Sequence, residues 1–460
     1  MYKFSYNSKT KYIPQKSHLA PPQNRIITSK FKFSDTPKNP WRLRDEWKRM
    51  LYPEGLRKDI LAGITVGCAA LPLSLAIAEA SNLSPSVGIT SAVVGGTVAS
   101  LFGGTTLAIT GPSAAMGIIL SDMVVKHGLH AVIGITLLCG VYQVITSFTK
   151  IPMLITKIPK PVITGFSFGV GSIIGISQIP KILGVKVPHD IIQDGNIPVL
   201  QYLADNINYV QPIPLSVAIA TLSLFKLLPM INRKIPPIIG GISIMTGISY
   251  ALGLDLSVIG EFSGLNMSII SMEMISNHEG ILQPMILSSL AVYFLASMES
   301  LLSSSLADKL CTDKDIPKHN SKQEILGQGL ANISSSLVGG MPVTSVIART
   351  TLNISLDAKT RRSALIHCLT LVGLSTLFFP IISHIPTACI SSTLLMIAYK
   401  LFSFNDVTSL YKENKLSLIP FGITFLTTIG TNLTLGVSSG LLSSYIIHKL
   451  FSRKPPSGNL

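Results

Sequence analysis

The stretch that decides the fold runs from Leu337 to Leu356 and reads LVGGMPVTSVIARTTLNISL. A Gly pair and Pro342 come first, and helix-compatible residues then carry Arg349 into apolar surroundings. Proline fits the first turn of a helix, where no backbone N–H is needed, so Pro342 predicts a helix that starts there. A helix that begins inside a membrane exposes unpaired N–H groups and the positive end of its dipole. Such an end is stable only against an anion or a watery cavity.

The same arrangement occurs once more, at Leu107 to Met116, which reads LAITGPSAAM. A short β-compatible run precedes the Gly-Pro pair, and a small-residue helix with Ser113 follows, as Thr344 and Ser345 follow the other proline. Two interrupted segments, one in each half of a polytopic chain, indicate a transporter site made by an inverted repeat. The alternative is a pair of Gly-Pro loops between ordinary spans.

The composition is that of a membrane protein. The chain has 460 residues, of which 47% are hydrophobic and 13% charged, and a mean hydropathy of +0.50. It is too apolar for a soluble protein of this length. Much of the net charge of +15 lies in the first 60 residues and in short loops, as in cytoplasmic segments rather than a nucleic-acid-binding surface. The cysteines have no CxxC or metal-ligand spacing and are interpreted as packing residues: Cys68, Cys139, Cys311, Cys368 and Cys389.

The apolar runs predict an all-α polytopic membrane protein with about 14 transmembrane segments in two inverted repeats of seven. Half-helices of the third and tenth segments would meet at the midplane. The predicted domains are a basic, partly disordered tail (1–58), a first repeat (59–254), an external loop (255–282), a second repeat (283–450) and a short C-terminal tail (451–460). Within the first tail, residues 41–58 suit an amphipathic helix on the membrane face. The predicted spans lie near 60–80, 87–102, 112–125, 129–149, 160–184, 214–231, 236–254, 283–309, 323–338, 343–356, 362–380, 385–401 and 416–448, with a short piece near 402–412.

The charges of the loops predict the topology. Basic breaks at 150–160, 226–234, 309–322 and 359–362 alternate with acidic loops at 187–212 and 255–280. We expect the basic breaks and both termini to be cytoplasmic and the acidic loops external. The basic cluster at 412–415 is an exception that this scheme places outside. No signal peptide is recognised, so we expect a plasma-membrane protein, with a bacterial inner membrane favoured.

Glu299 is an ionisable residue near the middle of a predicted span, where a charge costs roughly 2.5–3.5 kcal/mol on insertion scales. Ser303 lies one turn further on the same face, with Ser300 alongside. A carboxylate and hydroxyls on one face suit a Na⁺ ion, and a buried carboxylate also suits a proton. The alternatives are a packing hydrogen bond for Glu299, and for Arg349 a structural ion pair with an acidic residue such as Glu299.

Five motifs that occur in order along the chain resemble those of the SulP anion transporter family, the sulfate permeases. The resemblance covers roughly residues 41 to 450. The motifs are Asp59-Ile-Leu-Ala-Gly-Ile-Thr-Val-Gly with Leu71-Pro72, Ile109-Thr-Gly-Pro-Ser-Ala-Ala, Glu299-Ser-Leu-Leu-Ser with Ala307-Asp308, the run from Asn320 to Asn332, and Gly339-Gly-Met-Pro-Val-Thr with Ala348-Arg-Thr.

The resemblance implies fourteen segments, a gate domain that moves against a core domain, and an anion site between the third and tenth segments. It also implies that Glu299 and Ser303 occupy the position of the coupling cation or proton. Two departures limit it: the chain stops shortly after its last span, where many members continue with a STAS domain, and Leu73 stands where some members have Gln. The implied anion-binding residues are Ser113, Ala114, Val343, Thr344, Ser345, Ala348 and Arg349.

The expected function is therefore secondary active transport of a small inorganic anion, sulfate by family default, by alternating access and coupled to H⁺ or Na⁺. Sodium-coupled bicarbonate or dicarboxylate transport and an uncoupled anion channel are the alternatives. A nucleobase permease is disfavoured because a neutral base does not need Arg349. No enzymatic activity is expected, because the histidines lack ligand spacing and a nucleophile partner. We expect no cofactor beyond the coupling ion, no nucleic acid partner, and a homodimer as a possible assembly.

Overall fold

The computed structural model describes residues 43–155, 158–188, 191, 196–231, 237–259, 282–313, 315–431 and 433–451. The predicted disorder of the N-terminal tail, most of the predicted external loop and nearly all of the C-terminal tail lie outside these residues.

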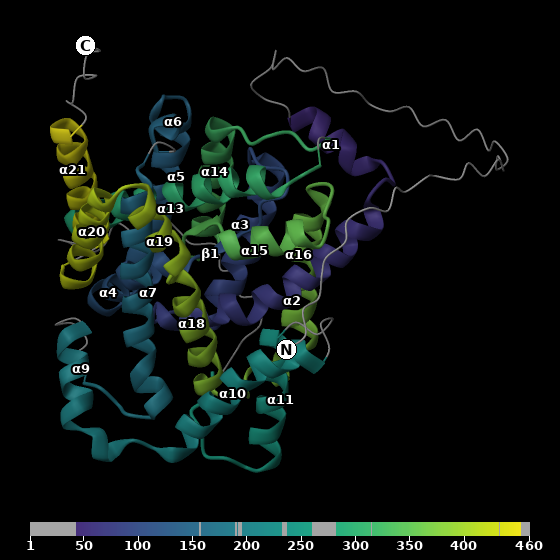
Figure 1. The fold of residues 1–460 in the computed structure, drawn as a ribbon. Helices are drawn as coiled ribbons and strands as arrows, with labels where there is room; N and C mark the ends of the chain where they lie inside the picture. The colour runs from purple at the N-terminus through teal and green to yellow at the C-terminus, as the bar shows by residue number, and fades with distance from the viewer. Residues whose placement is uncertain are drawn as a thin grey trace, which may run out of the picture. The chain divides into compact units, whose positions relative to one another are not determined.

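The described chain is mainly helical, with one two-stranded sheet (Figure 1). Apart from short 3₁₀ turns at Ile207–Tyr209 and Lys415–Ser417, the elements are α1 (Leu43–Leu51), α2 (Leu56–Ala80), α3 (Pro85–Phe102), β1 (Thr110–Pro112), α4 (Ala114–His127), α5 (Leu129–Ser147), α6 (Ile151–Ile155), α7 (Lys160–Leu183), α9 (Asn196–Asp205), α10 (Pro212–Ile231), α11 (Pro237–Ala251), α13 (Leu282–Leu310), α14 (Ser321–Leu337), β2 (Val343–Ser345), α15 (Ile347–Ser355), α16 (Arg362–Leu377), α17 (Phe379–Ile382), α18 (Thr387–Leu401), α19 (Phe404–Glu413), α20 (Leu418–Gly430) and α21 (Leu433–Phe451).

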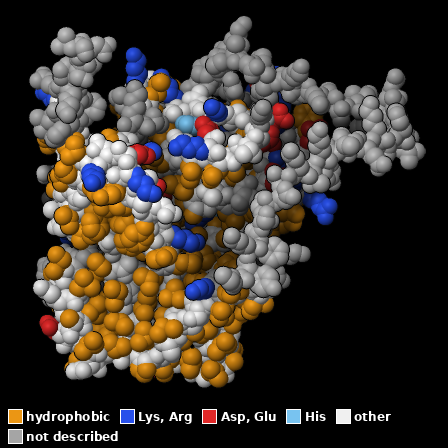
Figure 2. Space-filling view, in the orientation of Figure 1, with side chains coloured by type: hydrophobic (Ala, Val, Ile, Leu, Met, Phe, Trp, Pro, Cys, Tyr) orange, Lys and Arg blue, Asp and Glu red, His pale blue; other side chains and the backbone are white. Residues whose placement is uncertain are grey.

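Many of these helices suit a bilayer. Within the described residues, seven stretches are long and apolar enough to cross a membrane: Leu56–Ala80, Pro85–Phe102, Leu129–Ser147, Lys160–Leu183, Pro212–Ile231, Leu282–Leu310 and Thr387–Glu413. Four shorter apolar helices accompany them. Figure 2 shows hydrophobic side chains over the lower part of one face and most of its Lys and Arg side chains in the upper part. The predicted helical polytopic fold is confirmed.

Contacts divide the helices into two groups. In the first helix group, α14 packs against α3 and α5, α16 against α2 and α3, and α13 against α5. In the second helix group, α7 packs against α18, α20 and α21, and α10 against α11 and α18. Helix α2 belongs to the first group and also contacts α11 and α18, so it lies where the groups meet.

Glycines allow helices of the first group to approach closely. A Cβ on Gly140 of α5 would lie 2.7 Å from the carbonyl oxygen of Gly329 of α14, and a Cβ on Gly329 would lie 2.8 Å from the carbonyl oxygen of Gly140. Such mutual contact leaves no room for any side chain. Small residues at an interface let membrane helices gain van der Waals contact where the hydrophobic effect between them is weak.

Helix α1 is held by a buried ion pair. The carboxylate of Glu46 pairs with the guanidinium of Arg361, and the two side chains are 7% and 1% exposed. Arg361 also donates to the carbonyl oxygens of Ser100 (2.9 Å) and Gly103 (2.7 Å) at the end of α3. The helix expected within 41–58 is therefore present, although α2 already begins at Leu56.

Two boundaries differ from expectation. The helix predicted to start at Pro342 begins instead at Ile347, because residues Val343–Ser345 form strand β2 and hydrogen-bond across to β1. Strand pairing satisfies backbone groups that a first helical turn would otherwise leave unpaired. The predicted range 416–448 contains two helices, α20 and α21.

Candidate functional site

The two Gly/Pro stretches meet in one strand pair. Strands β1 and β2 are antiparallel, with Thr110 opposite Ser345, Gly111 opposite Thr344 and Pro112 opposite Val343. Helix α4 follows β1 directly and α15 follows β2, and β1 packs against α3 and α2 within the bundle (Figure 1). The half-helices predicted for the third and tenth segments thus begin at the same place, with both N-termini beside the sheet. Helix N-termini at one point create a positive potential that favours an anion.

The two helix starts are capped differently. Ser113 caps α4 by accepting a hydrogen bond from the backbone N–H of Ala115 (3.3 Å), and its hydroxyl donates to Oε2 of Glu299 (2.6 Å). Helix α15 starts after Val346, which gives no side-chain cap. The first N–H groups of α15 therefore lack the side-chain acceptor that a Ser, Thr or Asp cap would supply.

Amide side chains hold the sheet in place from behind. Asn332 of α14 accepts from the backbone N–H of Val343 (2.7 Å) and donates to its carbonyl oxygen (3.1 Å). The same Asn332 amide donates to Oε1 of Gln143 on α5 (2.8 Å), and Gln328 donates to the hydroxyl of Thr110 (2.9 Å). Each strand has only three residues, so the backbone bonds between the strands are few. The hydrogen bonds from these amide side chains therefore help to fix the position of the sheet.

Hydroxyl groups of α13 fix the end of β2. Ser300 accepts from the backbone N–H of Ser345 (3.1 Å), the Ser345 hydroxyl donates to Ser303 (3.0 Å), and Ser303 donates to Thr350 (3.2 Å). The Ser303 hydroxyl thus hydrogen-bonds to a residue of β2 and to a residue of α15. The Glu299 carboxylate instead accepts from Ser113, at the start of α4. Helix α13 therefore joins both half-helices.

Arg349 is the charged group at the centre of this arrangement. It lies in the first turn of α15, its side chain is 2% exposed, and its Nη2 donates to the hydroxyl of Ser74 on α2 (3.1 Å). Its Nε and Nη1 have no hydrogen-bond partner among the described residues. Nor does any ion pair within the described chain join it to Glu299. A Cβ on Gly111 would lie 2.1 Å from Nη1, so only a glycine lets the guanidinium lie against β1.

Leaving hydrogen-bond donors of a buried charged side chain without an acceptor is energetically unfavourable. An unsatisfied buried polar group costs about 1–3 kcal/mol, and more when it is charged. An anion beside Arg349 would accept from Nε and Nη1 and would also meet the free N–H groups of α15. The geometry therefore suits a small anion with several acceptor oxygens.

The other predicted site residues lie close by, and all but one of them are at least partly buried. Val343, Thr344 and Ser345 are buried in β2, and Ala114 is partly buried at the start of α4. Ala348 is exposed on α15. Their roles in binding stay predictions. No group of three or more His, Cys, Asp or Glu residues in the described part of the chain is placed to hold a metal ion.

Sequence reasoning missed Ser74, whose hydroxyl is the observed partner of the arginine. It is a single serine in the apolar helix α2, fully buried two residues after Pro72. The proline was part of a recognised motif, but nothing in the pattern indicated which side chain of α2 would point to Arg349.

Comparisons with known proteins identify the family. Residues 56–424 match the sulfate permease family. The putative sulfate transporter YvdB of Bacillus subtilis is 29% identical over 401 residues, which cover 85% of this chain and 73% of that protein. The bicarbonate transporter BicA of Picosynechococcus is 27% identical over 417 residues, which cover 86% of this chain and 71% of that protein.

Solved structures show the same architecture. The transmembrane domain of a cyanobacterial bicarbonate transporter BicA has a TM-score of 0.73 and 25% identity, and the match covers 86% of this chain and 98% of that one. Murine Slc26a9 in its inward-facing state has a TM-score of 0.79, with 94% of this chain and 74% of that one covered, but at 17% identity it supports the fold alone. The family and these neighbours are transporters, not enzymes. With its motifs in order, its half-helices at one strand pair and a match over most of its length, this chain belongs to the sulfate permease family.

Proposed function

We propose that this protein is a secondary active transporter that moves a small inorganic anion by alternating access, with sulfate as the first candidate and H⁺ or Na⁺ as the coupling ion. The single observation that carries the anion site is Arg349, whose buried guanidinium has two unpaired N–H groups beside the uncapped start of α15. We place the anion between β1, β2 and the N-termini of α4 and α15.

The coupling ion would act at Glu299. Its hydrogen bond to Ser113 links the carboxylate to the start of α4, so a proton or Na⁺ on Glu299 changes the charge facing the anion site. A neutralised Glu299 repels a bound anion less than an ionised one does, which makes the two binding events mutually favourable. This reciprocity is the physical basis of coupling in our proposal.

Alternating access would come from the two helix groups. Both half-helices, α13 and the amide side chains behind the sheet belong to the first group or bond to it, so the proposed site would move with that group past α10, α11 and α18.

Sodium-coupled bicarbonate transport is the second candidate. The relative BicA, which is named as a bicarbonate transporter, resembles this chain both in sequence and in structure. Bicarbonate and sulfate both present oxygen acceptors to an arginine, so the geometry of Arg349 accommodates either of them.

Uptake into proteoliposomes tests the proposal. Purified protein would be assayed with radiolabelled sulfate and bicarbonate, each with and without an inward Na⁺ or H⁺ gradient. We expect saturable uptake of one anion that a single cation gradient accelerates. Sodium-driven bicarbonate uptake without sulfate flux selects the second candidate. Flux that follows the anion gradient alone, with no dependence on either cation, contradicts coupled transport and indicates a channel.

Two variants test the site. Arg349→Gln removes at least one charged hydrogen bond worth about 1.5–3 kcal/mol, so uptake at limiting anion should fall at least roughly 10- to 100-fold. Glu299→Gln should remove the cation dependence and leave downhill anion flux. The matched control is Glu413→Gln, a side chain 61% exposed in a distant surface ion pair. Wild-type uptake by both site variants, at normal expression, would refute the assignment.

A further inference from the structure

One ion pair joins the two helix groups. Nζ of Lys181, near the end of α7, lies 3.0 Å from Oε1 of Glu79, near the end of α2. Helix α2 belongs to the first group and α7 to the second. No other ion pair between described residues joins a helix of the first group to a helix of the second.

This ion pair lies at the same end of both helices. Glu79 is the last residue but one of α2, and Lys181 lies two residues before the end of α7. Both helices begin at basic segments, the N-terminal tail and the break at 150–160, which the charge pattern predicts to be cytoplasmic. At 1.5 Å per residue, their 25 and 24 residues are roughly 37 and 36 Å long, enough to cross a hydrocarbon core of about 30 Å. The predicted topology therefore makes this the external end.

The ion pair lies on the external side of the anion site proposed above. Ser74, which accepts from Arg349, is on the same helix as Glu79 and five residues before it, or roughly 7.5 Å along the axis. Just after α2, Asn82 donates to the hydroxyl of Ser121 on α4 (2.8 Å), and α4 packs against α7. With the ion pair formed, the two groups are therefore held together between the proposed site and the external surface.

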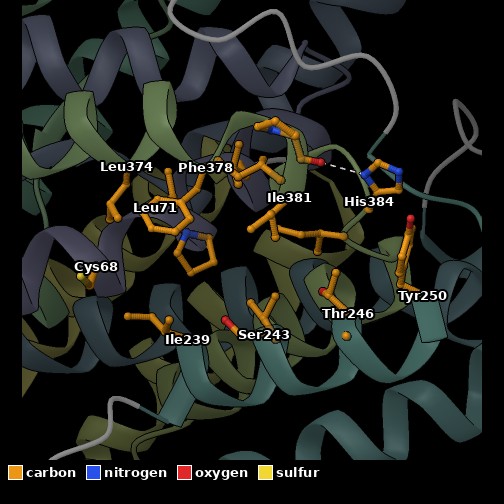
Figure 3. Close-up of a pocket in the computed structure, with 17 residues that line it drawn as sticks. Cys68, Leu71, Ile239, Ser243, Thr246, Tyr250, Leu374, Phe378, Ile381 and His384 are labelled. Atoms are coloured by element: carbon orange, nitrogen blue, oxygen red, sulfur yellow. Dashed lines mark hydrogen bonds between the residues drawn. The ribbon is translucent and has the colours of Figure 1, made fainter.

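Another part of the boundary between the groups is packed loosely. A crevice of about 690 Å³ separates α11 of the second group from α2, α16 and the chain around α17 (Figure 3). Nearly all of its lining is apolar, for example Leu71, Ile242 and Leu374. Walls that are separated by such a space lose van der Waals contact, and apolar walls have no directional bond to break when they move. The charges of Glu79 and Lys181 form a directional link where this boundary has none.

The exposure of the pair suits a contact that opens and closes. The side chains of Lys181 and Glu79 are 35% and 20% exposed, so water reaches both charges once the groups part. A fully buried pair would leave a costly unpaired charge, and a fully exposed pair would hold the groups only weakly. Oε2 of Glu79 is buried and has no partner among the described residues. This oxygen gains hydrogen bonds when water enters, which offsets part of the attraction that closes the pair.

We propose that the ion pair between Glu79 and Lys181 is an external gate. It forms when the external route to the anion site is closed, and it breaks when the two helix groups part at that end. This inference rests on the proposed function, because a gate between the groups serves alternating access. The structure holds this gate closed.

A reporter cysteine measures the opening of the gate without measuring transport. Ile174 of α7 is 4% exposed and lies two turns deeper than Lys181 on the same face, so water reaches it when the groups part. Purified Ile174→Cys protein in detergent micelles would react with a sulfonated maleimide, whose charge keeps it out of apolar interiors. Peptide mass spectrometry would give the rate of adduct formation at position 174, separately from the native cysteines. This rate is the baseline for the charge variants.

Charge reversal breaks the pair, and double reversal restores it. In the reporter background, Glu79→Lys places two positive charges opposite each other, and Lys181→Glu places two negative ones. Losing the attraction between partly exposed charges shifts an equilibrium by up to about fivefold, and repulsion adds to this shift. We therefore expect each single variant to raise the labelling rate at least about threefold. The double variant should return to within about twofold of the baseline.

The matched control is Asp122→Lys. Asp122 pairs with Lys126 within α4 (2.7 Å), and both side chains are 50% exposed. It follows Ser121, the partner of Asn82, so the same reversal of charge is made at the same end of the bundle but not between the groups. We expect the baseline rate. The proposal is overturned if the control labels as fast as Glu79→Lys, if both single variants keep the baseline rate, or if the double variant labels as fast as they do.

Transport is tested separately by a cross-link. In a protein that carries both Glu79→Cys and Lys181→Cys, a bifunctional methanethiosulfonate as long as the two original side chains would hold the gate closed. We expect uptake of the transported anion to fall to the level of protein-free liposomes and to recover when dithiothreitol cleaves the cross-link. Uptake that continues through the cross-linked protein would overturn the gate. A protein that carries no anion before cross-linking contradicts the proposed function instead, and the labelling rates still decide whether the ion pair holds the groups together.

Discussion

Neutralising Glu46 should release helix α1 from the rest of the protein. The variant Glu46→Gln keeps the shape of the side chain, and the hydroxyl of Thr106, which donates to Glu46 at 3.1 Å, can still donate to an amide oxygen. What is lost is the negative charge beside Arg361, a side chain that is 1% exposed. Arg361 keeps only neutral carbonyl acceptors, at the end of α3.

The magnitude follows from the burial of this ion pair. Removing one partner of a buried pair costs about 3–5 kcal/mol, because the other charge is left uncompensated. At the lower end of that range, and at 1.4 kcal/mol per factor of ten, the population of molecules with α1 detached should rise roughly 100-fold.

Limited proteolysis measures that population. Lys48 and Arg49 of α1 become trypsin sites when the helix detaches, and at low trypsin concentration the cleavage rate tracks the detached fraction. Cleavage after these residues would be followed by mass spectrometry for protein in micelles. The control is Glu54→Gln, which makes the same change in charge at an exposed side chain near the end of α1. A Glu46→Gln rate within threefold of the parent would refute the reasoning.

Three further outcomes are expected. Gly111→Ala should lower anion uptake at least tenfold, because the new Cβ would lie 2.1 Å from Nη1 of Arg349 and displace it. Burial alone would lower the pKa of His319, but its hydrogen bond to Asp308 and the charge of that carboxylate together raise this pKa above its ordinary value. Protonation of His319 therefore stabilises the fold fully below about pH 6.5, and this stabilisation is lost as the pH rises through the raised pKa. The melting temperature of the parent should fall as the pH rises, and that of His319→Asn should fall less. Asn332→Ala should cost at least about 2 kcal/mol of unfolding free energy, measured by denaturant titration, because it unpairs backbone groups of β2.

The first two of these have control variants, and the third has a contradicting outcome. Gly373→Ala adds a Cβ in open space and should leave uptake unchanged, so an equal loss in both glycine variants would contradict the arginine argument. His384→Asn removes an exposed histidine and should keep the parent's pH profile. If Asn332→Ala unfolds at the parent's midpoint, strand β2 does not depend on that amide.

The sequence was sufficient for the helical membrane fold and for the family. Apolar runs of spanning length and motifs in fixed order are local features that need no knowledge of contacts. The approximate positions of both half-helices also followed from the Gly/Pro stretches, because Gly and Pro residues interrupt a helix. The start of α15 did not follow: Pro342 is a good first residue of a helix, but the pairing of β2 with β1 overrides that local preference.

Contacts between distant segments could not be predicted in the same way. The pairing register, the Ser74 partner of Arg349 and the bond between Ser113 and Glu299 each join residues of different spans. A serine in an apolar helix gives no sign of which neighbour it will meet. Helical spacing and the family resemblance placed Ser303 beside Glu299, but neither could show that the Ser303 hydroxyl also hydrogen-bonds to Ser345 and Thr350.

The distance in sequence between the two strands also determines how long the first waits for the second during synthesis. Gly111 leaves the ribosome about 230 residues before its partner Thr344. At about 5–20 residues per second, β1 and the start of α4 wait roughly 10 to 50 s in the membrane for their partner. Throughout that interval the backbone groups of β1 must find temporary partners, and Arg349 has not yet been made. The charge that the site is built around is thus inserted well after β1 and α4, and a delay in synthesis between the two strands should leave the first half exposed to quality-control proteases.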